Sequence, residues 1–297
     1  MSSTKNPTSF SSGSVNELKE ITNKEILKEI KKYSPHSERM TLNTLLLINL
    51  NKHICNEGES GIGKSWNTED LVNLMKMPHR LISGHISPKA FYEVLQQDGI
   101  IIIDEGALVL SNIAIQNLLL NALWNGKVEW TNNKEVLTHD FKGCICFNTN
   151  SLNNNATMKA VADRLFVTKI KLNSNQIKEK IMSSKNYKPN MKIWAEIKER
   201  IQENKKTELS EKISNKIYAL MEHGEPKSVR DIAKLKDVAR FSLNLMGDLS
   251  LIDYFIDTDE VWTIMNMDIK RSEKVKKIAE LKCMTDRGAR RIAEKFE

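Results

Sequence analysis

The amino-acid sequence predicts an α/β protein: a parallel-sheet core, an all-α domain and a small helical C-terminal tail. Short apolar runs alternate with longer helical patterns as far as residue 172, and this alternation is typical of a parallel sheet. Four consecutive isoleucines, at 100–103, indicate a strand that is buried on both faces. After Asn173 the pattern contains only helices.

The strands and helices of the core follow from these patterns. Strands are predicted at residues 52–56, 80–84, 99–104, 144–148 and 165–172. Helices are predicted between them at 67–75, 88–97 and 112–124, and two more, at 15–33 and 37–50, precede the sheet. Segments 127–131 and 135–139 flank Asn132 and Asn133, and because Asn favours turns we expect a β-hairpin there.

The chain divides into four predicted regions. Residues 1–14 are rich in Ser and Thr and are expected to be a disordered leader; the core spans 15–172, the all-α domain 173–250 and the tail 251–297. Helices of the all-α domain are predicted at 175–184, 191–205, 208–223 and 228–246.

The tail has the pattern of a possible helix-turn-helix. Two helices, at 273–281 and 285–296, flank a turn at 282–284. Arg287, Arg290 and Arg291 would then face nucleic acid, whereas a solvated C-terminal helix is the alternative. A helix at 252–263 is also predicted, with a short hairpin as the other interpretation.

Composition restricts the class of protein. The chain has 297 residues and a net charge of +7, and no apolar run is long enough to span a membrane, so we expect a cytoplasmic protein. The basic excess lies after residue 170, where the sequence has 27 basic and 21 acidic residues. Residues 1–170 have 18 basic and 17 acidic residues. This excess favours an acidic partner, nucleic acid first, although a solubilising surface is the alternative. Four cysteines without zinc-site spacing are expected to be reduced.

One segment matches the phosphate-binding pattern G-x-x-x-x-G-K-[ST]. Its residues are Gly58, Glu59, Ser60, Gly61, Ile62, Gly63, Lys64 and Ser65. Glycines allow backbone N–H groups to point at phosphate oxygens, and the next helix adds the positive end of its dipole. Lys64 would reach the β- and γ-phosphates, Ser65 would ligate Mg²⁺, and Trp66 would also contact the nucleotide. The motif predicts ATP and Mg²⁺ as ligands; an ordinary glycine-rich turn is the alternative.

Two acidic residues follow the isoleucine run. Asp104 and Glu105 stand at the carboxyl end of a predicted parallel strand, where such sheets bind ligands. Asp104 is predicted to hold Mg²⁺ through its water shell, and Glu105 to orient or deprotonate the attacking water. Acids also end strands to begin a turn, but the preceding phosphate-binding segment favours the catalytic interpretation.

With these motifs in this order, residues 37–247 resemble an AAA+ ATPase. The resemblance implies that the all-α domain is a lid and that ATP binds between subunits of a ring or arc. It also implies that a polar residue at the end of the fourth strand positions the attacking water. The run Phe147-Asn148-Thr149-Asn150 ends that strand; Asn150 is our choice, and Asn148 is the alternative.

The resemblance further implies one catalytic arginine and one arginine that binds the nucleotide. Residues 160–166 are similar to the segment whose arginine contacts the γ-phosphate of the neighbouring subunit, which makes Arg164 the candidate. Residues 228–232 are similar to the start of a lid helix whose arginine contacts the nucleotide of its own subunit, which makes Arg230 the candidate. An ion pair with Asp163 and an ordinary surface position are the respective alternatives.

A narrower similarity, over residues 83–95, is to small ATPases encoded by phages and mobile elements. We therefore expect an oligomeric ATPase that acts on DNA, as a helicase, a helicase loader, or a replication or transposition motor. A protein-remodelling ATPase is the alternative, and a slowly hydrolysing nucleotide switch is a third hypothesis. The sequence leaves open the ring size, the direction of movement, the pathway and the choice among DNA, RNA and protein.

Overall fold

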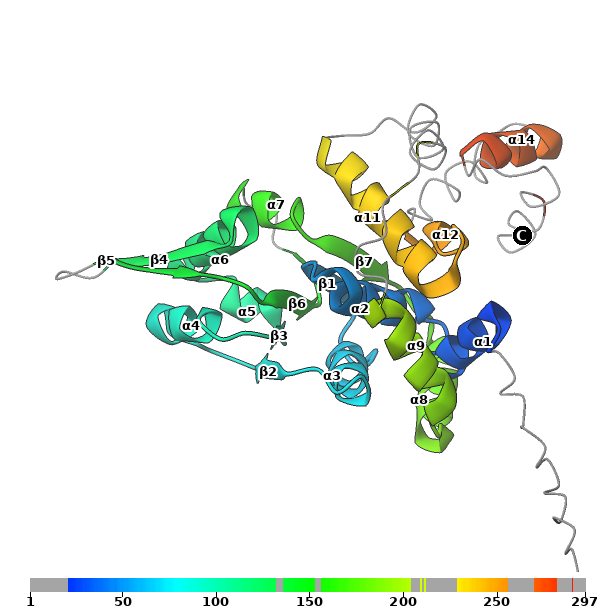
Figure 1. Ribbon diagram of the computed structural model, residues 1–297, viewed down its shortest axis with the longest axis horizontal. Helices are drawn as coiled ribbons and strands as arrows, with labels where there is room; N and C mark the ends of the chain where they lie inside the picture. The colour runs from blue at the N-terminus through cyan, green and yellow to red at the C-terminus, as the bar shows by residue number, and fades with distance from the viewer. Residues whose placement is uncertain are drawn as a thin grey trace, which may run out of the picture.

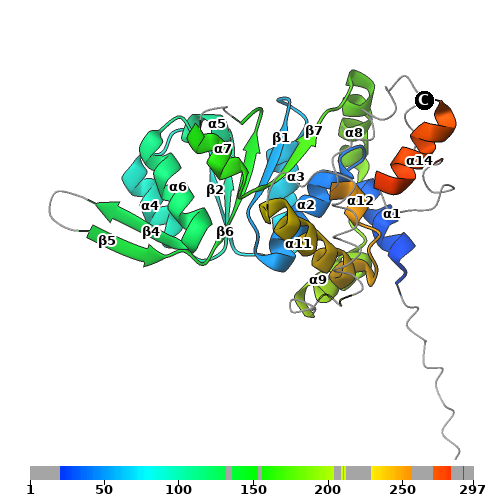
Figure 2. The ribbon, with the colours of Figure 1, turned by 90° about the horizontal axis from the view of Figure 1, so that it is seen from above.

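The computed structural model describes residues 21–131, 136–152, 156–203, 229–255 and 270–281, and the single positions 209, 211 and 290. Its centre is a parallel sheet with the strand order β2-β3-β6-β1-β7 (Figures 1 and 2). The strands are β1 (Ile54–Gly58), β2 (His79–Ile82), β3 (Ile100–Ile103), β6 (Cys144–Thr149) and β7 (Phe166–Ile170). The predicted α/β fold with a parallel sheet is confirmed.

Helices cover both faces of the sheet (Figure 2). They are α2 (Glu38–Leu50), α3 (Lys64–Leu74), α4 (Pro88–Leu95), α5 (Gly106–Val109), α6 (Ile113–Asn125) and α7 (Ala156–Ala162). Successive residues of a strand point to opposite faces. Accordingly, Ile100 and Ile102 belong to the hydrophobic cluster with α2 and α3, and Ile101 and Ile103 to the cluster with α4, α6 and α7. The isoleucine run is therefore buried on both faces, as predicted.

The first strand and the next helix differ from the prediction by two or three residues. Strand β1 begins at Ile54 instead of residue 52, because its pairing with β7 begins at Phe166. Helix α3 begins at Lys64 instead of residue 67. Gly63 adopts a left-handed conformation, with φ of 80°, and this turns the chain directly into the helix. The loop between β1 and α3 is consequently shorter than the predicted boundaries of the strand and the helix indicate.

All but the last of the helices that follow the sheet pack against helix α1 (Asn23–Tyr33) or α2. They are α8 (Ser174–Asn186), α9 (Met191–Glu203), α11 (Val229–Met246), α12 (Ile252–Phe255) and α14 (Arg271–Leu281). Trp194 of α9 and Phe241 of α11 belong to the same buried cluster as Tyr33 of α1. None of the helices in the described ranges is long and apolar enough to cross a membrane.

Several predictions lie outside the described residues. These are the leader, the helix at 208–223, the hairpin turn at 132–135, the second tail helix and Cys283. The described cysteines, Cys55, Cys144 and Cys146, are free and buried, as expected. The helix-turn-helix and the four-region division remain predictions.

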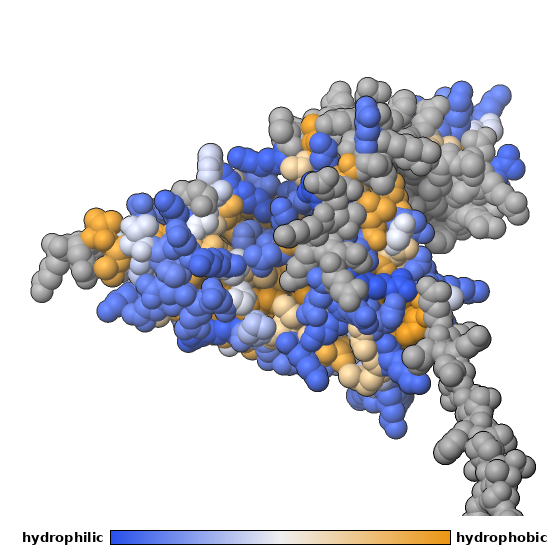
Figure 3. Space-filling view, in the orientation of Figure 1, coloured by the Kyte–Doolittle hydropathy of each residue, from blue (hydrophilic) through white to orange (hydrophobic). Residues whose placement is uncertain are grey.

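The predicted hairpin is present and projects from the core (Figure 1). Its strands are β4 (Lys127–Thr131) and β5 (Val136–Asp140), which pair antiparallel. On β4, Trp130, which pairs with Leu137 of β5, packs against Tyr92 of α4, with 6.1 Å between ring centroids. Near its outer end Val136 and Leu137 are exposed, and Figure 3 shows apolar surface there on an otherwise mostly hydrophilic face.

Candidate functional site

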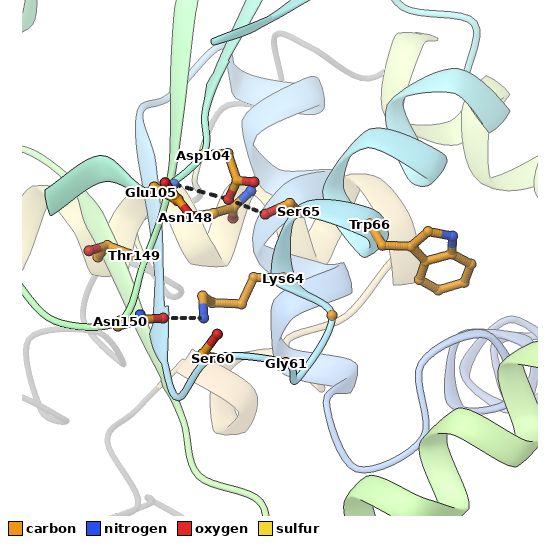
Figure 4. Close-up of a pocket in the computed structure, with 11 residues that line it drawn as sticks. Ser60, Gly61, Lys64, Ser65, Trp66, Asp104, Glu105, Asn148, Thr149 and Asn150 are labelled. Carbon is orange, nitrogen blue, oxygen red and sulfur yellow. Dashed lines mark hydrogen bonds between the residues drawn. The ribbon is translucent and has the colours of Figure 1, made fainter. Parts of the chain in front are cut away.

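A cavity of about 500 Å³ lies at the carboxyl edge of the sheet (Figure 4). It is formed where β1, β3 and β6, which are neighbours in the sheet, reach their ends. Its lining residues are Ser60, Gly61, Gly63, Lys64, Ser65, Trp66, Asp104, Glu105, Asn148, Thr149 and Asn150. The structure thus brings together the phosphate-binding segment, the two predicted acids and both candidate asparagines.

Glycines shape the phosphate-binding loop. Gly61 and Gly63 both have φ of 80°, a conformation that disfavours side chains with a Cβ. Gly58 is needed for space, because a Cβ there would lie 2.6 Å from the Ile170 carbonyl oxygen and 2.7 Å from the Ile62 Cδ1 atom. The loop can therefore pack closely on β7 and direct the N-terminus of α3 toward the cavity, where the helix dipole favours an anion.

Lys64 is held inside the loop. Its Nζ donates to the carbonyl oxygens of Gly58 at 2.7 Å and Glu59 at 2.8 Å, and to Asn150 Oδ1 at 3.2 Å. Burial lowers the pKa of Lys64, while the nearby Asp104 carboxylate opposes that shift. The ammonium group is thus positioned at the cavity by neutral acceptors, leaving its charge available to an anionic ligand.

Ser65 and Asp104 form the second polar pair. The Ser65 hydroxyl donates to Asp104 Oδ1 across the cavity (Figure 4). Both are hard oxygen donors, the type that Mg²⁺ prefers, and Mg²⁺ in phosphate sites takes only one or two protein ligands. No cluster of three or more His, Cys, Asp or Glu side chains suited to a metal occurs among the described residues. The donor set therefore fits a magnesium ion shared with phosphate oxygens and water.

Glu105 has an unusual backbone conformation. Its φ is 52°, in the left-handed region, which costs a residue with a Cβ roughly 1–2 kcal/mol. Its backbone N–H donates to Asp104 Oδ1 at 3.0 Å, and this bond stabilises the turn after β3. The turn leaves the Glu105 side chain exposed on the cavity wall. A carboxylate in that position can accept a proton from a water molecule in the cavity.

The two candidate asparagines occupy different environments. Asn150 is exposed and contacts Lys64, whereas Asn148 is completely buried. Asn148 Oδ1 accepts hydrogen bonds from Asn56 Nδ2 at 3.2 Å and Thr68 Oγ1 at 3.3 Å. Asn148 therefore ties β6 to β1 and α3 beneath the loop, and Asn150 is the amide that is accessible from the cavity.

A second cavity, of about 250 Å³, adjoins the first along Gly61, Gly63 and Trp66. Its other wall is helix α8 and the segment between β7 and α8, and its lining is mostly apolar: Ile62, Leu172, Ile177, Ile181, Lys180 and Ser184. The indole of Trp66 points away from the Lys64 side of the first cavity (Figure 4). The two cavities therefore share one wall, and the second is the more apolar of the two.

Lys180 of α8 is a residue of this site that sequence reasoning missed. Its Nζ donates to Ser37 Oγ at 2.7 Å, and a Cβ on Gly63 would lie 3.9 Å from it. Burial lowers the pKa of Lys180 to about 8; Glu38 opposes this shift and Lys64 adds to it. Lys180 belongs to no motif, and only the packing of α8 against the loop distinguishes it from the other lysines of that helix.

Arg164 and Arg230 do not line either cavity. The Arg230 guanidinium lies 3.5 Å from Asp163 Oδ2, and both arginines lie over the ring of Trp124. In this structure Arg230 therefore lies beside Asp163 and Trp124 and not at the cavity of its own chain. The physical reason is that α11 begins beside the end of α7, away from the loop, so that α8 supplies the cation next to the loop (Figure 1).

The comparisons with known proteins establish the fold alone. No protein-family model and no curated protein matches the chain. A solved structure of a candidate ATPase from Cytophaga hutchinsonii is similar, with 17% sequence identity, a TM-score of 0.51 and coverage of 92% of each chain. It is one of 369 similar solved chains, so the parallel α/β fold is widespread and the function has to be argued from the site.

Proposed function

We propose that the protein is a magnesium-dependent ATPase of the AAA+ type. The observation that carries the proposal is the single cavity in which Lys64, Ser65, Asp104, Glu105 and Asn150 meet at the carboxyl edge of the sheet. Each residue has the chemistry that one part of phosphoryl transfer to water requires. The likeness to a candidate ATPase supports this proposal.

The chain's own residues have separate tasks in this reaction. The loop N–H groups and Lys64 bind the β- and γ-phosphates, and Asn150 exchanges its Lys64 contact for the attacking water. Glu105 accepts a proton from that water as its oxygen approaches the γ-phosphorus. Ser65 and Asp104 would hold Mg²⁺, which neutralises charge on the phosphate oxygens.

The second cavity is proposed to receive the nucleobase. This cavity adjoins the loop, is mostly apolar and is bounded by Trp66. These features suit the flat, largely apolar ring of a nucleobase. Lys180 of α8 then supplies a positive charge to the bound nucleotide. The sequence had suggested Arg230 for this role. A nucleotide in both cavities would therefore connect α8 to the loop.

Replacing Lys180 with Met is expected to weaken ATP binding about 10-fold at pH 7, because a charged group beside Gly63 of the phosphate loop is lost. ATP favours protonated Lys180, so wild-type affinity should fall as pH rises through about 8, the pKa of free Lys180. The variant should lack this fall. Calorimetric titrations at pH 7 and 9 measure both effects, and Lys185→Met, in an exposed position of the same helix, is the control. Equal pH dependence in the wild type and Lys180→Met would contradict the assignment.

We further propose that the ATPase acts as an oligomer on DNA. The basic excess after residue 170 and the projecting hairpin support an acidic polymer as substrate. The hairpin's exposed Val136 and Leu137 instead favour the second candidate, a protein-remodelling ATPase that grips apolar segments.

An ATPase assay with single-stranded DNA, duplex DNA, RNA or an unfolded protein separates these functions. We expect DNA to raise the rate several-fold, in a manner that is lost at high salt. Hydrolysis that only unfolded protein stimulates would replace the first candidate by the second. A rate that no polymer changes would contradict both.

A further inference from the structure

Lys180 of α8 is a buried amine without a neutralising carboxylate. Only 6% of the residue is exposed. Its Nζ lies 2.7 Å from Ser37 Oγ, which in turn lies 2.7 Å from Ser34 Oγ, so its polar surroundings are hydroxyl groups. Among the described residues, no Asp or Glu forms an ion pair with Lys180. A buried ammonium group of this kind is poorly stabilised, which favours the neutral and nucleophilic amine.

The charges around Lys180 keep part of this amine neutral near pH 7. Burial is the main reason that the pKa of Lys180 falls to about 8; Glu38 of α2 opposes this shift and Lys64 of α3 adds to it. At pH 7.5 about a quarter of the amine is then neutral, compared with about 0.1% for a lysine at the usual pKa of about 10.4. The nucleophilic form is therefore about 200-fold more abundant than in an ordinary lysine.

The other lysine of the site differs in its hydrogen bonds. Lys64 Nζ donates to the Gly58 and Glu59 carbonyl oxygens and to Asn150 Oδ1. These three acceptors match the three N–H groups of an ammonium ion, so they hold Lys64 in its charged form. The described residues offer Lys180 one acceptor, the Ser37 hydroxyl. Lys64 thus suits anion binding, whereas Lys180 suits attack on an electrophile.

The position of Lys180 brings it close to the phosphate-binding loop. It lines the second cavity, which shares Gly61, Gly63 and Trp66 with the first. A Cβ on Gly63 would lie 3.9 Å from Lys180 Nζ. The loop and the N-terminus of α3 favour a phosphate group on the other side of this shared wall. A small molecule whose phosphate binds there can therefore present its other end to the amine.

We propose that Lys180 is a modification site, acylated by small acyl phosphates. The phosphate group binds at the loop, and the neutral amine attacks the adjacent carbonyl carbon. A C–N bond forms and the C–O bond to phosphate breaks. Phosphate leaves with the electron pair of that bond and takes the proton that the amine gives up. The inference rests on the proposed binding of phosphate by the loop, but not on ATP hydrolysis.

Acylation of Lys180 would regulate the nucleotide site. The product is a neutral amide, so the positive charge beside Gly63 is lost. We therefore expect ATP affinity to fall about 10-fold on acylation, as for Lys180→Met. Acyl phosphates would in this way inhibit a protein that otherwise binds ATP, without any change in the loop itself.

The test is incubation of the full-length protein with acetyl phosphate at pH 7.5, followed by peptide mass spectrometry over time. Lys180 should be acetylated about 10-fold faster than Lys185, an exposed lysine of the same helix. This is less than the 200-fold excess of neutral amine, because a less basic amine is a weaker nucleophile and burial restricts access. Equal rates at Lys180 and Lys185 would overturn the inference.

Two further measurements test the role of the loop. Inorganic phosphate should slow acetylation of Lys180 and leave Lys185 unaffected. The preference for Lys180 should also be smaller with p-nitrophenyl acetate, an acyl donor that has no phosphate group. The same preference with both reagents, without protection by phosphate, would show that the loop does not direct the acyl donor and would overturn the inference.

The consequence for ATP binding is measured by calorimetry after the reagent is removed, with each protein compared with its own untreated form. Treatment should weaken ATP binding by the wild type and leave that of Lys180→Arg unchanged, because a guanidinium group stays charged and is not acylated. An equal loss in both proteins would place the effect at another lysine and contradict regulation through Lys180.

The outcomes separate the inference from the proposed function. Selective, phosphate-sensitive acetylation of Lys180 in a protein that does not bind ATP would support the inference and contradict the proposed ATPase. Normal ATP binding and hydrolysis without selective acetylation of Lys180 would overturn the inference and leave the proposed ATPase in place.

Discussion

Replacing Glu105 with Gln should abolish most ATP hydrolysis and leave ATP binding intact. Glutamine keeps the size of the side chain and its place on the cavity wall, but it cannot accept a proton from water. Positioned general bases contribute about 10²- to 10⁴-fold to rate, and we expect a loss of that size in kcat. The bound state should persist, because the loop, Lys64 and Ser65 are unchanged.

The control for this variant is Glu93→Gln, which makes the same chemical change at an exposed position of α4. Steady-state phosphate release and nucleotide titration measure the two properties separately. Glu105→Gln with near wild-type kcat would remove Glu105 from catalysis. A joint loss of binding and rate would instead assign the residue a structural role in the turn after β3.

Replacing Lys64 with Ala should remove nucleotide binding itself. The ammonium group is buried against the Gly58 and Glu59 carbonyls, and it is a charged donor that the loop directs into the cavity. Truncating a buried charged partner costs about 3 kcal/mol, roughly 10²-fold in affinity. The two carbonyls also lose their donor, which loosens the loop further.

Lys89→Ala, at an exposed position of α4, is the matched control and should bind ATP as the wild type does. Calorimetry or fluorescence of a labelled nucleotide gives the affinities, and thermal unfolding without ligand checks that the variant is folded. ATP affinity that survives Lys64→Ala would show that the loop is an ordinary turn before a helix, the alternative that the sequence left open.

The fold could be predicted from sequence because its signals are local. The isoleucine run of β3 needs burial on both faces, and the loop glycines need either left-handed φ or close packing on β7. Asp104 and Glu105 could be placed because parallel strands end at one edge of a sheet. Errors of two or three residues arose at β1 and α3, where pairing and a single left-handed glycine set the boundary.

The parts that were missed depend on contacts between distant segments. Lys180 reaches the loop only because α8 packs beside Ser37 and Gly63, and no spacing in the sequence records that contact. The similarity placed Arg230 at the nucleotide of its own subunit, whereas in the structure Arg230, near the start of α11, lies beside Trp124 and Asp163. Which residues contact the end of a helix depends on the tertiary structure. The sequence of the helix alone therefore could not identify them.

The central claim is that the cavity between the phosphate loop and Asp104 binds and hydrolyses ATP with magnesium. The most direct test is phosphate release from ATP by the purified protein, with Mg²⁺ and then with EDTA, for the wild type and Glu105→Gln at one protein concentration. We expect the wild type to release phosphate with Mg²⁺ and not with EDTA. With Mg²⁺, Glu105→Gln should release phosphate at a low residual rate. Release that is equal in the wild type and Glu105→Gln, or no magnesium-dependent nucleotide binding by the wild type, would contradict the claim.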